Sequence, residues 1–120
     1  NQDDKIFIAT SKVIKKLSKN SCVIVGRCAD DILKDKKNVY KIFLYSDSDN
    51  KIKRATKYYG INKSKALNEI KKVDKQREKY YKYYTGKNWK DYNNYDLAIN
   101  VDTLGVEKTA QMIKDIIKTK

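Results

Sequence analysis

The sequence has no histidine or proline, and its 120 residues include only two cysteines, four glycines and three arginines. The absence of histidine excludes imidazole general bases and most zinc sites. Cys22 and Cys28 have no other soft ligand to complete a tetrahedral site, so we expect free thiols and no metal. No apolar run approaches the roughly 20 residues of a membrane span. With no signal peptide at its start, the sequence predicts a cytoplasmic, soluble protein without membrane contacts.

Positive charge is abundant, with a formal net charge of +13, and almost all of it is lysine. Lysine, asparagine, tyrosine and isoleucine together indicate an AT-rich coding bias, so charge alone does not establish nucleic-acid binding. The three arginines are Arg27, Arg54 and Arg77. A guanidinium group binds phosphate through two parallel hydrogen bonds, which lysine cannot do. We interpret the arginines as a phosphate-binding set, with structural salt bridges as the alternative.

Helical and strand patterns alternate along the chain. Apolar periodicity, caps and terminating glycines predict helices near residues 3–18, 29–33, 47–59, 62–86 and 106–118. Continuous apolar runs predict strands at 21–25, 39–45 and 95–100. Such alternation is typical of a single α/β domain with a parallel sheet.

The strings VIVGRCAD, VYKIFLYSDSDNKIKR, KVDKQREKYYKYYTG and NYDLAIN occur in this order over almost the whole chain. In order and spacing they resemble the cytidylate kinase-like family of P-loop nucleoside monophosphate kinases. The resemblance implies a three-layer αβα parallel sheet of P-loop kinase type. None of the four glycines belongs to a GxxxxGK[ST] phosphate loop. We therefore expect the sheet to be present only in part, without its central phosphate-loop strand.

The resemblance also implies a function. Residues 1–120 are expected to be the C-terminal portion of one kinase-like domain, with a small lid around 54–66. The complete domain would use ATP and Mg²⁺ to phosphorylate a nucleoside monophosphate, with CMP or dCMP as the preferred acceptor. This chain alone would bind neither cofactor and would be inactive, because it lacks the phosphate loop. The sequence does not indicate an oligomeric state.

Two candidate residues lie near the first predicted strand. By resemblance Arg27 matches the arginine of a Gly-Arg turn that contacts the acceptor nucleotide. Asp30 is a further candidate for substrate binding, although capping of a short helix is the better explanation of this residue. The family has an aspartate directly after the arginine, where this chain has Cys28, and this departure leaves the acceptor base open.

Three more candidates lie on the later helices. Arg54 matches an arginine at the lid edge that reaches the transferring phosphoryl group, and Arg77 matches a second catalytic arginine. Asp74 lies one helical turn before Arg77, either as a ligand of the substrate or as an ordinary intrahelical ion pair. Tyr81 and Tyr84 continue the apolar stripe of the same helix, so we expect packing in preference to base stacking.

Two other functions remain open at this level. A basic domain that binds nucleic acid through lysine and tyrosine predicts a contiguous basic face and salt-dependent binding. A kinase-fold remnant would retain the fold without activity. The kinase hypothesis predicts instead that Arg27, Arg54 and Arg77 converge on one cleft.

Overall fold

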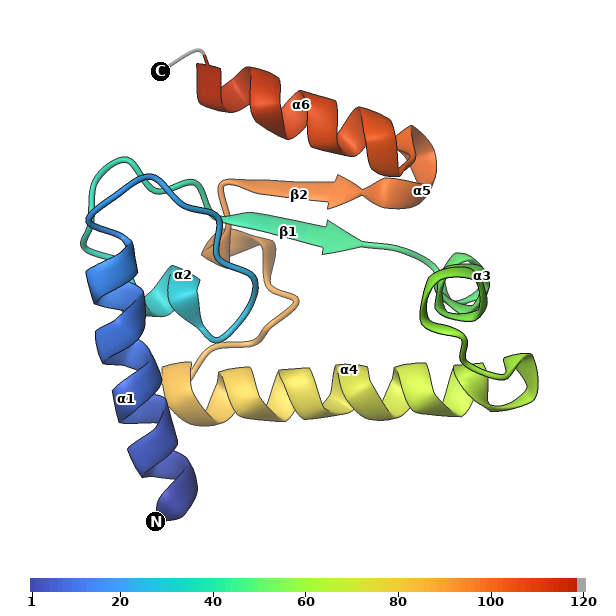
Figure 1. Ribbon diagram of the computed structural model, residues 1–120, viewed down its shortest axis with the longest axis horizontal. Coiled ribbons are helices and arrows are strands. Elements are labelled where there is room, and N and C mark those ends of the chain that lie inside the picture. The colour runs from blue at the N-terminus through green and yellow to red at the C-terminus, as the bar shows by residue number, and fades with distance from the viewer. Residues whose placement is uncertain (119–120) are drawn as a thin grey trace.

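A computed structural model describes residues 1–118, which are mainly helical. The helices are α1 (Gln2–Leu17), α2 (Ala29–Ile32), α3 (Ser48–Tyr59), α4 (Lys63–Thr85), the short η1 (Tyr92–Asn94), α5 (Val101–Leu104) and α6 (Val106–Lys118). The strands are β1 (Ile42–Tyr45) and β2 (Leu97–Asn100). In Figure 1 the two strands lie between α6 and α4, and α1 runs across the C-terminal end of α4.

Local sequence signals account for the long helices. The Asn1 side chain accepts a hydrogen bond from the Asp4 backbone N–H and caps α1. The Asn62 side chain caps α4 in the same way, and α4 ends at Gly86. The predicted helices are confirmed, with their ends shifted by one or two residues.

The predicted three-layer αβα parallel sheet of P-loop kinase type is wrong for this chain. Within residues 1–118 the sheet consists of β1 and β2, paired in parallel with Ile42 opposite Leu97 and Tyr45 opposite Asn100. Residues 21–25, the first of the three predicted strands, do not form a strand. Val23 is 89% exposed and Val25 is 87% exposed. An apolar run forms a strand only beside a neighbour that pairs with its backbone, and this segment has none within the described residues.

The strand predicted at 39–45 is shorter than expected. Residue Asn38 has a left-handed backbone, with φ of 63°, and β1 begins only at Ile42. The turn at Asn38 therefore excludes residues 39–41, the first of the apolar run, from the strand.

The interior is divided into small clusters. Ile14 of α1 packs with Ala29 and Leu33 around α2. Phe7 stacks on Tyr84 with ring centroids 3.9 Å apart, and Tyr81 is buried. These contacts join α1, α2 and α4 and confirm the packing role predicted for the two tyrosines. Near the sheet, Phe43 contacts the rings of Tyr95 and Trp89.

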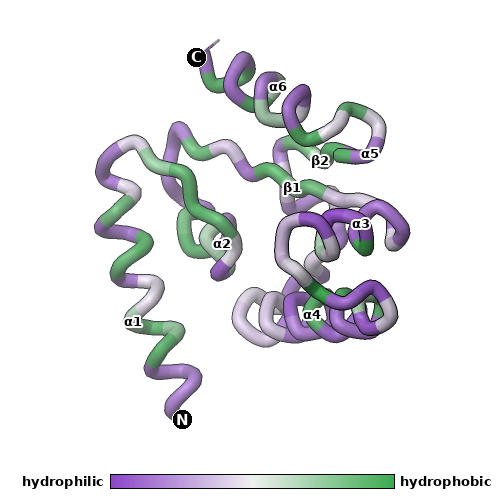
Figure 2. The backbone as a smooth tube through the Cα atoms, turned by 45° about the vertical axis from the view of Figure 1, so that its right-hand side comes forward, coloured by the Kyte–Doolittle hydropathy of each residue, from purple (hydrophilic) through white to green (hydrophobic). Residues whose placement is uncertain are grey.

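Much apolar surface remains exposed. A compact monomer of 14.1 kDa exposes roughly 6,700 Å², whereas this chain exposes 9389 Å². Its radius of gyration is 15.7 Å, compared with about 14 Å for a compact domain of this length. Figure 2 shows an apolar stretch in the loop between α1 and α2, and apolar residues that alternate with hydrophilic ones along α6, at the periphery of the molecule. Within residues 1–118, no helix combines the length and apolar character required to cross a membrane.

Candidate functional site

A cleft of about 720 Å³ lies beyond the carboxyl end of β1. Its walls come from α3 and the loop after it, from α4, α5 and α6, and from the end of β1. Ligands in parallel α/β structures bind at this end of the strands. One part of the lining is charged, and the other part is apolar, including Leu44, Ala55, Ile61, Ile70, Val73, Val106, Ala110 and Ile113.

The charged part of the cleft contains three cations. Lys51 and Arg54 come from consecutive turns of α3, and Arg77 comes from the middle of α4. Two carboxylates, Glu69 and Asp74, share the lining with them. The packing of α3 against α4 thus gathers positive groups that are far apart in the sequence.

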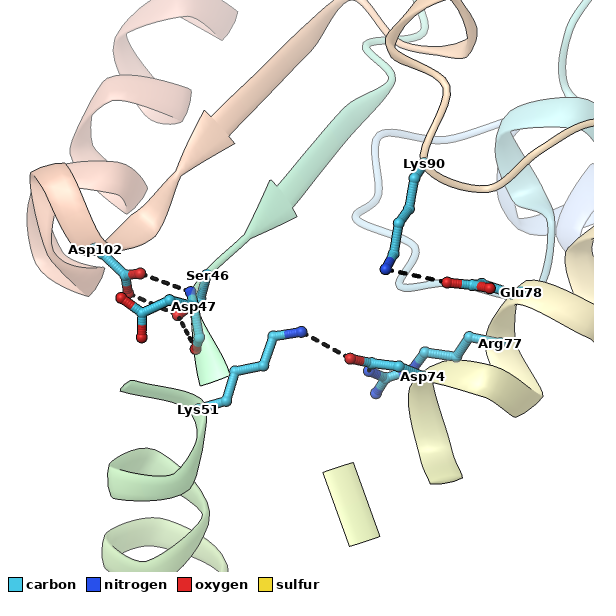
Figure 3. A network of polar contacts seen from close by, with 8 residues as sticks. All are labelled: Ser46, Asp47, Lys51, Asp74, Arg77, Glu78, Lys90 and Asp102. Atoms are coloured by element: carbon cyan, nitrogen blue, oxygen red, sulfur yellow. Dashed lines mark hydrogen bonds and ion pairs between the residues drawn. The ribbon is translucent and has the colours of Figure 1, made fainter. Parts of the chain in front are cut away.

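Asp74 joins two of these cations. Its Oδ2 lies 2.7 Å from Lys51 Nζ and its Oδ1 lies 3.1 Å from Arg77 Nη1. Figure 3 shows the lysine reaching across from α3 to α4 to make this contact. The Asp74 side chain is 17% exposed, whereas that of Arg77 is 60% exposed. The carboxylate therefore fixes both cations at the cleft while the guanidinium group stays accessible.

Arg54 is held by a different carboxylate. Its Nη1 lies 3.7 Å from Asp102 Oδ1. Asp102 also accepts hydrogen bonds from the Ser46 hydroxyl at 2.6 Å and from the Asp47 backbone N–H at 2.8 Å, as Figure 3 shows. These hydrogen bonds lower the pKa of Asp102 from 3.8 to about 2, and the bond from the Ser46 hydroxyl has the largest effect. The carboxylate is thus fully ionised at neutral pH.

Arg27 lies outside the lining of this cleft. It belongs to a turn in which Gly26, Arg27 and Cys28 have φ of 70°, 57° and 58° in succession. Left-handed backbone at Arg27 and Cys28 costs on the order of 1 kcal/mol for each residue. Arg27 also lies beside the Tyr80 hydroxyl, where it opposes the rise in the tyrosine pKa that burial and the Cys28 thiol cause. Arg27 thus lies beside Tyr80, one turn of α4 beyond Arg77, and neither Arg27 nor Tyr80 lines the cleft.

Asp30 is occupied by a structural contact. The Tyr81 hydroxyl donates a hydrogen bond to Asp30 Oδ2 at 2.6 Å, which ties α2 to α4. Burial, followed by this bond to Asp30, raises the pKa of Tyr81. Burial also raises the pKa of the neighbouring Cys28 thiol from 9.0 to about 11, with contributions from Asp30 and Asp31. This cluster keeps the Gly-Arg turn in place.

The predicted convergence of Arg27, Arg54 and Arg77 on one cleft is wrong for Arg27, which does not line it. The structure brings together Arg54, Asp74 and Arg77, and leaves Arg27 and Asp30 in a separate cluster. Their roles in binding and catalysis stay predictions. Lys51 and Asp102 were missed by the sequence analysis, because one lysine among many carries no signal and Asp102 follows the last predicted strand. Helical spacing offered a signal for Lys51, since it lies one turn before Arg54.

The donor groups of the cleft suit an anion. Within residues 1–118, no group of three or more His, Cys, Asp or Glu side chains is arranged to hold a metal ion. The sequence also contains no glycine-rich phosphate loop. The use of ATP and Mg²⁺ by the complete domain stays a prediction.

Comparison with known proteins gives the family. The profile of the cytidylate kinase-like family matches residues 1–103. The chain belongs to the cytidylate kinase-like family. This match includes Lys51, Arg54, Asp74, Arg77 and Asp102, so the whole charged part of the cleft lies within the family's region. Membership indicates a kinase-like relationship.

A solved structure has a similar fold. The crystal structure of an uncharacterized protein from Eubacterium ventriosum ATCC 27560 is 36% identical in sequence, with a TM-score of 0.88. The comparison covers 96% of this cytidylate kinase-like chain and 66% of that chain, so this chain spans just under two thirds of its length. No curated protein gives a significant match.

Proposed function

We propose that the chain is part of a nucleotide kinase-like protein that transfers the γ-phosphoryl group of ATP to a nucleoside monophosphate. CMP or dCMP is the proposed acceptor. The observation that carries the proposal is the convergence of Lys51, Arg54 and Arg77 on one cleft at the end of β1, in a member of the cytidylate kinase-like family. A nucleotide offers a phosphate for the cations and a base for the apolar wall.

The cleft suits phosphoryl transfer because this reaction depends on charge stabilisation more than on proton transfer. A protein without histidine can therefore perform it. In the proposal, Arg54 and Arg77 stabilise the negative charge of the transferring phosphoryl group. Asp74 orders the cations through its contacts with Lys51 and Arg77. Arg27 and Asp30 belong to the neighbouring turn and serve the acceptor side.

The ATP side of the reaction lies outside these residues in this proposal. Residues 1–120 form the C-terminal portion of a larger kinase-like domain, with a small lid around 54–66, and are inactive alone. The exposed area supports this, because it exceeds that of a compact monomer by an amount typical of a large protein interface. Tyr59 and Ile61, from the proposed lid, line the cleft.

A coupled assay with Mg·ATP and a panel of nucleoside monophosphates tests the function in the full-length polypeptide. We expect turnover with CMP or dCMP, reduced roughly 100-fold or more in Arg54→Ala and Arg77→Ala, as when a group that contacts the transition state is removed. Lys79→Ala is the matched control, because Lys79 is exposed on the same helix and does not line the cleft. Turnover that survives both arginine substitutions would contradict the proposed site.

Nucleic-acid binding is the second candidate, favoured by the net charge of +13. It predicts affinity for oligonucleotides that falls steeply with salt and depends on many lysines equally. The same substitutions distinguish the two, since Lys79→Ala and Arg77→Ala would then weaken binding to a similar extent.

A further inference from the structure

The ends of the two strands are joined through one carboxylate, that of Asp102. Ser46 and Asp47 follow β1 directly. Asp102 is the second residue after β2, with Val101 between them. The Ser46 hydroxyl and the Asp47 backbone N–H both donate hydrogen bonds to the Asp102 carboxylate. Asp102 itself is held by its backbone N–H, which donates to the Asn100 side chain at 3.0 Å.

The same carboxylate faces Arg54. Asp47 is the cap of α3, and Arg54 lies on α3 two turns later. The Arg54 Nη1 is 3.7 Å from Asp102 Oδ1, which is an ion pair without a short hydrogen bond. The Asp102 side chain is 14% exposed and the Arg54 side chain is 31% exposed. The carboxylate therefore orients the guanidinium group at the cleft without occupying its hydrogen-bonding capacity.

We propose that Asp102 is a positioning residue for Arg54. By binding the β1–α3 turn and the guanidinium group together, it sets the location of the arginine relative to the carboxyl ends of the strands. A residue that acts on a phosphoryl group must be held to within a fraction of an ångström, so a supporting carboxylate of this kind matters for rate. The proposal rests on the proposed function, since it assigns Arg54 to the reacting phosphoryl group.

The test uses Asp102→Asn, which keeps the shape and one oxygen acceptor but removes the negative charge. Glu78→Gln is the matched control, because it removes one carboxylate charge from the exposed Glu78–Lys90 pair, which lies outside the cleft lining. The first readout is NMR of protein labelled with ¹⁵N-arginine, in which Arg54→Lys assigns the Arg54 Nε–H signal. We expect Asp102→Asn to shift this signal and to increase the mobility of the Arg54 side chain, and Glu78→Gln to leave both unchanged.

The second readout is the rate of phosphoryl transfer. We expect Asp102→Asn to lower kcat roughly tenfold with little change in KM for the acceptor, as misplacement of one group by a fraction of an ångström does. In an Arg54→Ala background, Asp102→Asn should have no further effect, because the two residues act as a unit. Glu78→Gln, which removes a carboxylate outside the cleft, should leave kcat unchanged.

Two results would overturn the proposal. One is an Arg54 Nε–H signal that is the same in wild type and Asp102→Asn. The other is a kcat that Asp102→Asn lowers equally with and without Arg54. If the wild-type protein transfers no phosphoryl group, the proposed function fails, whereas the NMR comparison still decides whether Asp102 orders Arg54.

Discussion

At the scale of single residues, the cleft is organised by two carboxylates with different partners. Asp74 holds Lys51 and Arg77, and Asp102 holds Arg54 together with the β1–α3 turn. Asp74 offsets the repulsion between Lys51 and Arg77, which would otherwise oppose the packing of α3 against α4. The two cations therefore stay close together at the cleft.

Asp74→Asn tests the first of these arrangements. We expect the free energy of unfolding to fall by about 1 kcal/mol, because two charge-assisted hydrogen bonds are lost while solvent screens Lys51 and Arg77 in part. Urea denaturation measures the change. Glu78→Gln is the control, since the Glu78–Lys90 pair is exposed on both sides and should matter by less than about 0.5 kcal/mol. Equal effects of the two substitutions would contradict the account.

The cysteines differ in accessibility and provide a second prediction. Cys22 is exposed, whereas Cys28 is buried and burial raises its thiol pKa to about 11. At pH 8 iodoacetamide should modify Cys22 readily and Cys28 only slowly, as mass spectrometry of the alkylated protein would show. Because the pKa of Cys28 is raised in the folded state, its contribution to stability is complete below pH 9.0 and is lost as the pH rises toward 11. Rapid alkylation of Cys28 in the native protein would contradict its placement.

The residue roles were only partly predictable. The scarcity of arginine in the sequence predicted functional roles for Arg54 and Arg77, and both residues line the cleft. Asp102 could not be found, because its importance depends on the adjacency of two strand ends that lie more than 50 residues apart in the sequence.

At the scale of elements, the helices and two of the three predicted strands follow from the sequence, whereas the strand predicted at 21–25 does not form. Caps such as Asn62 and terminators such as Gly86 act within a few residues, so a single sequence reveals them. A strand requires a partner elsewhere in the chain. Residues 21–25 have the composition of a buried strand, yet Val23 and Val25 are almost fully exposed.

Gly60 tests the element that borders the cleft. It ends α3 with φ of 65°, in the left-handed region, and a Cβ there would meet nothing within 4 Å. Gly60→Ala should therefore lower stability by about 1 kcal/mol through backbone strain alone. Thermal or urea unfolding measures this, with Lys53→Ala on the exposed surface of α3 as a control expected to stay within about 0.5 kcal/mol. A Gly60→Ala protein as stable as wild type would show that the turn has another conformation.

At the scale of the whole molecule, the chain is more open than its length requires. The area of 9389 Å² and the thin clusters of buried residues leave the walls of the cleft accessible. The sequence pattern predicted a three-layer sheet, whereas the described residues form a mainly helical structure with two parallel strands. Alternating helix and strand patterns in the sequence predict the order of the elements. They do not predict how many of the strands pair with a neighbour in a sheet.

Calorimetric titration of CMP into the full-length protein tests the central claim, that the cleft binds the phosphate of a nucleotide, most directly. The account predicts binding that Arg77→Ala weakens at least about tenfold, the loss of one charge-assisted contact. Lys79→Ala, on the same helix but outside the cleft, should leave the affinity unchanged. Binding that Arg77→Ala does not alter, or no binding of CMP, dCMP or any other nucleoside monophosphate, would contradict the account.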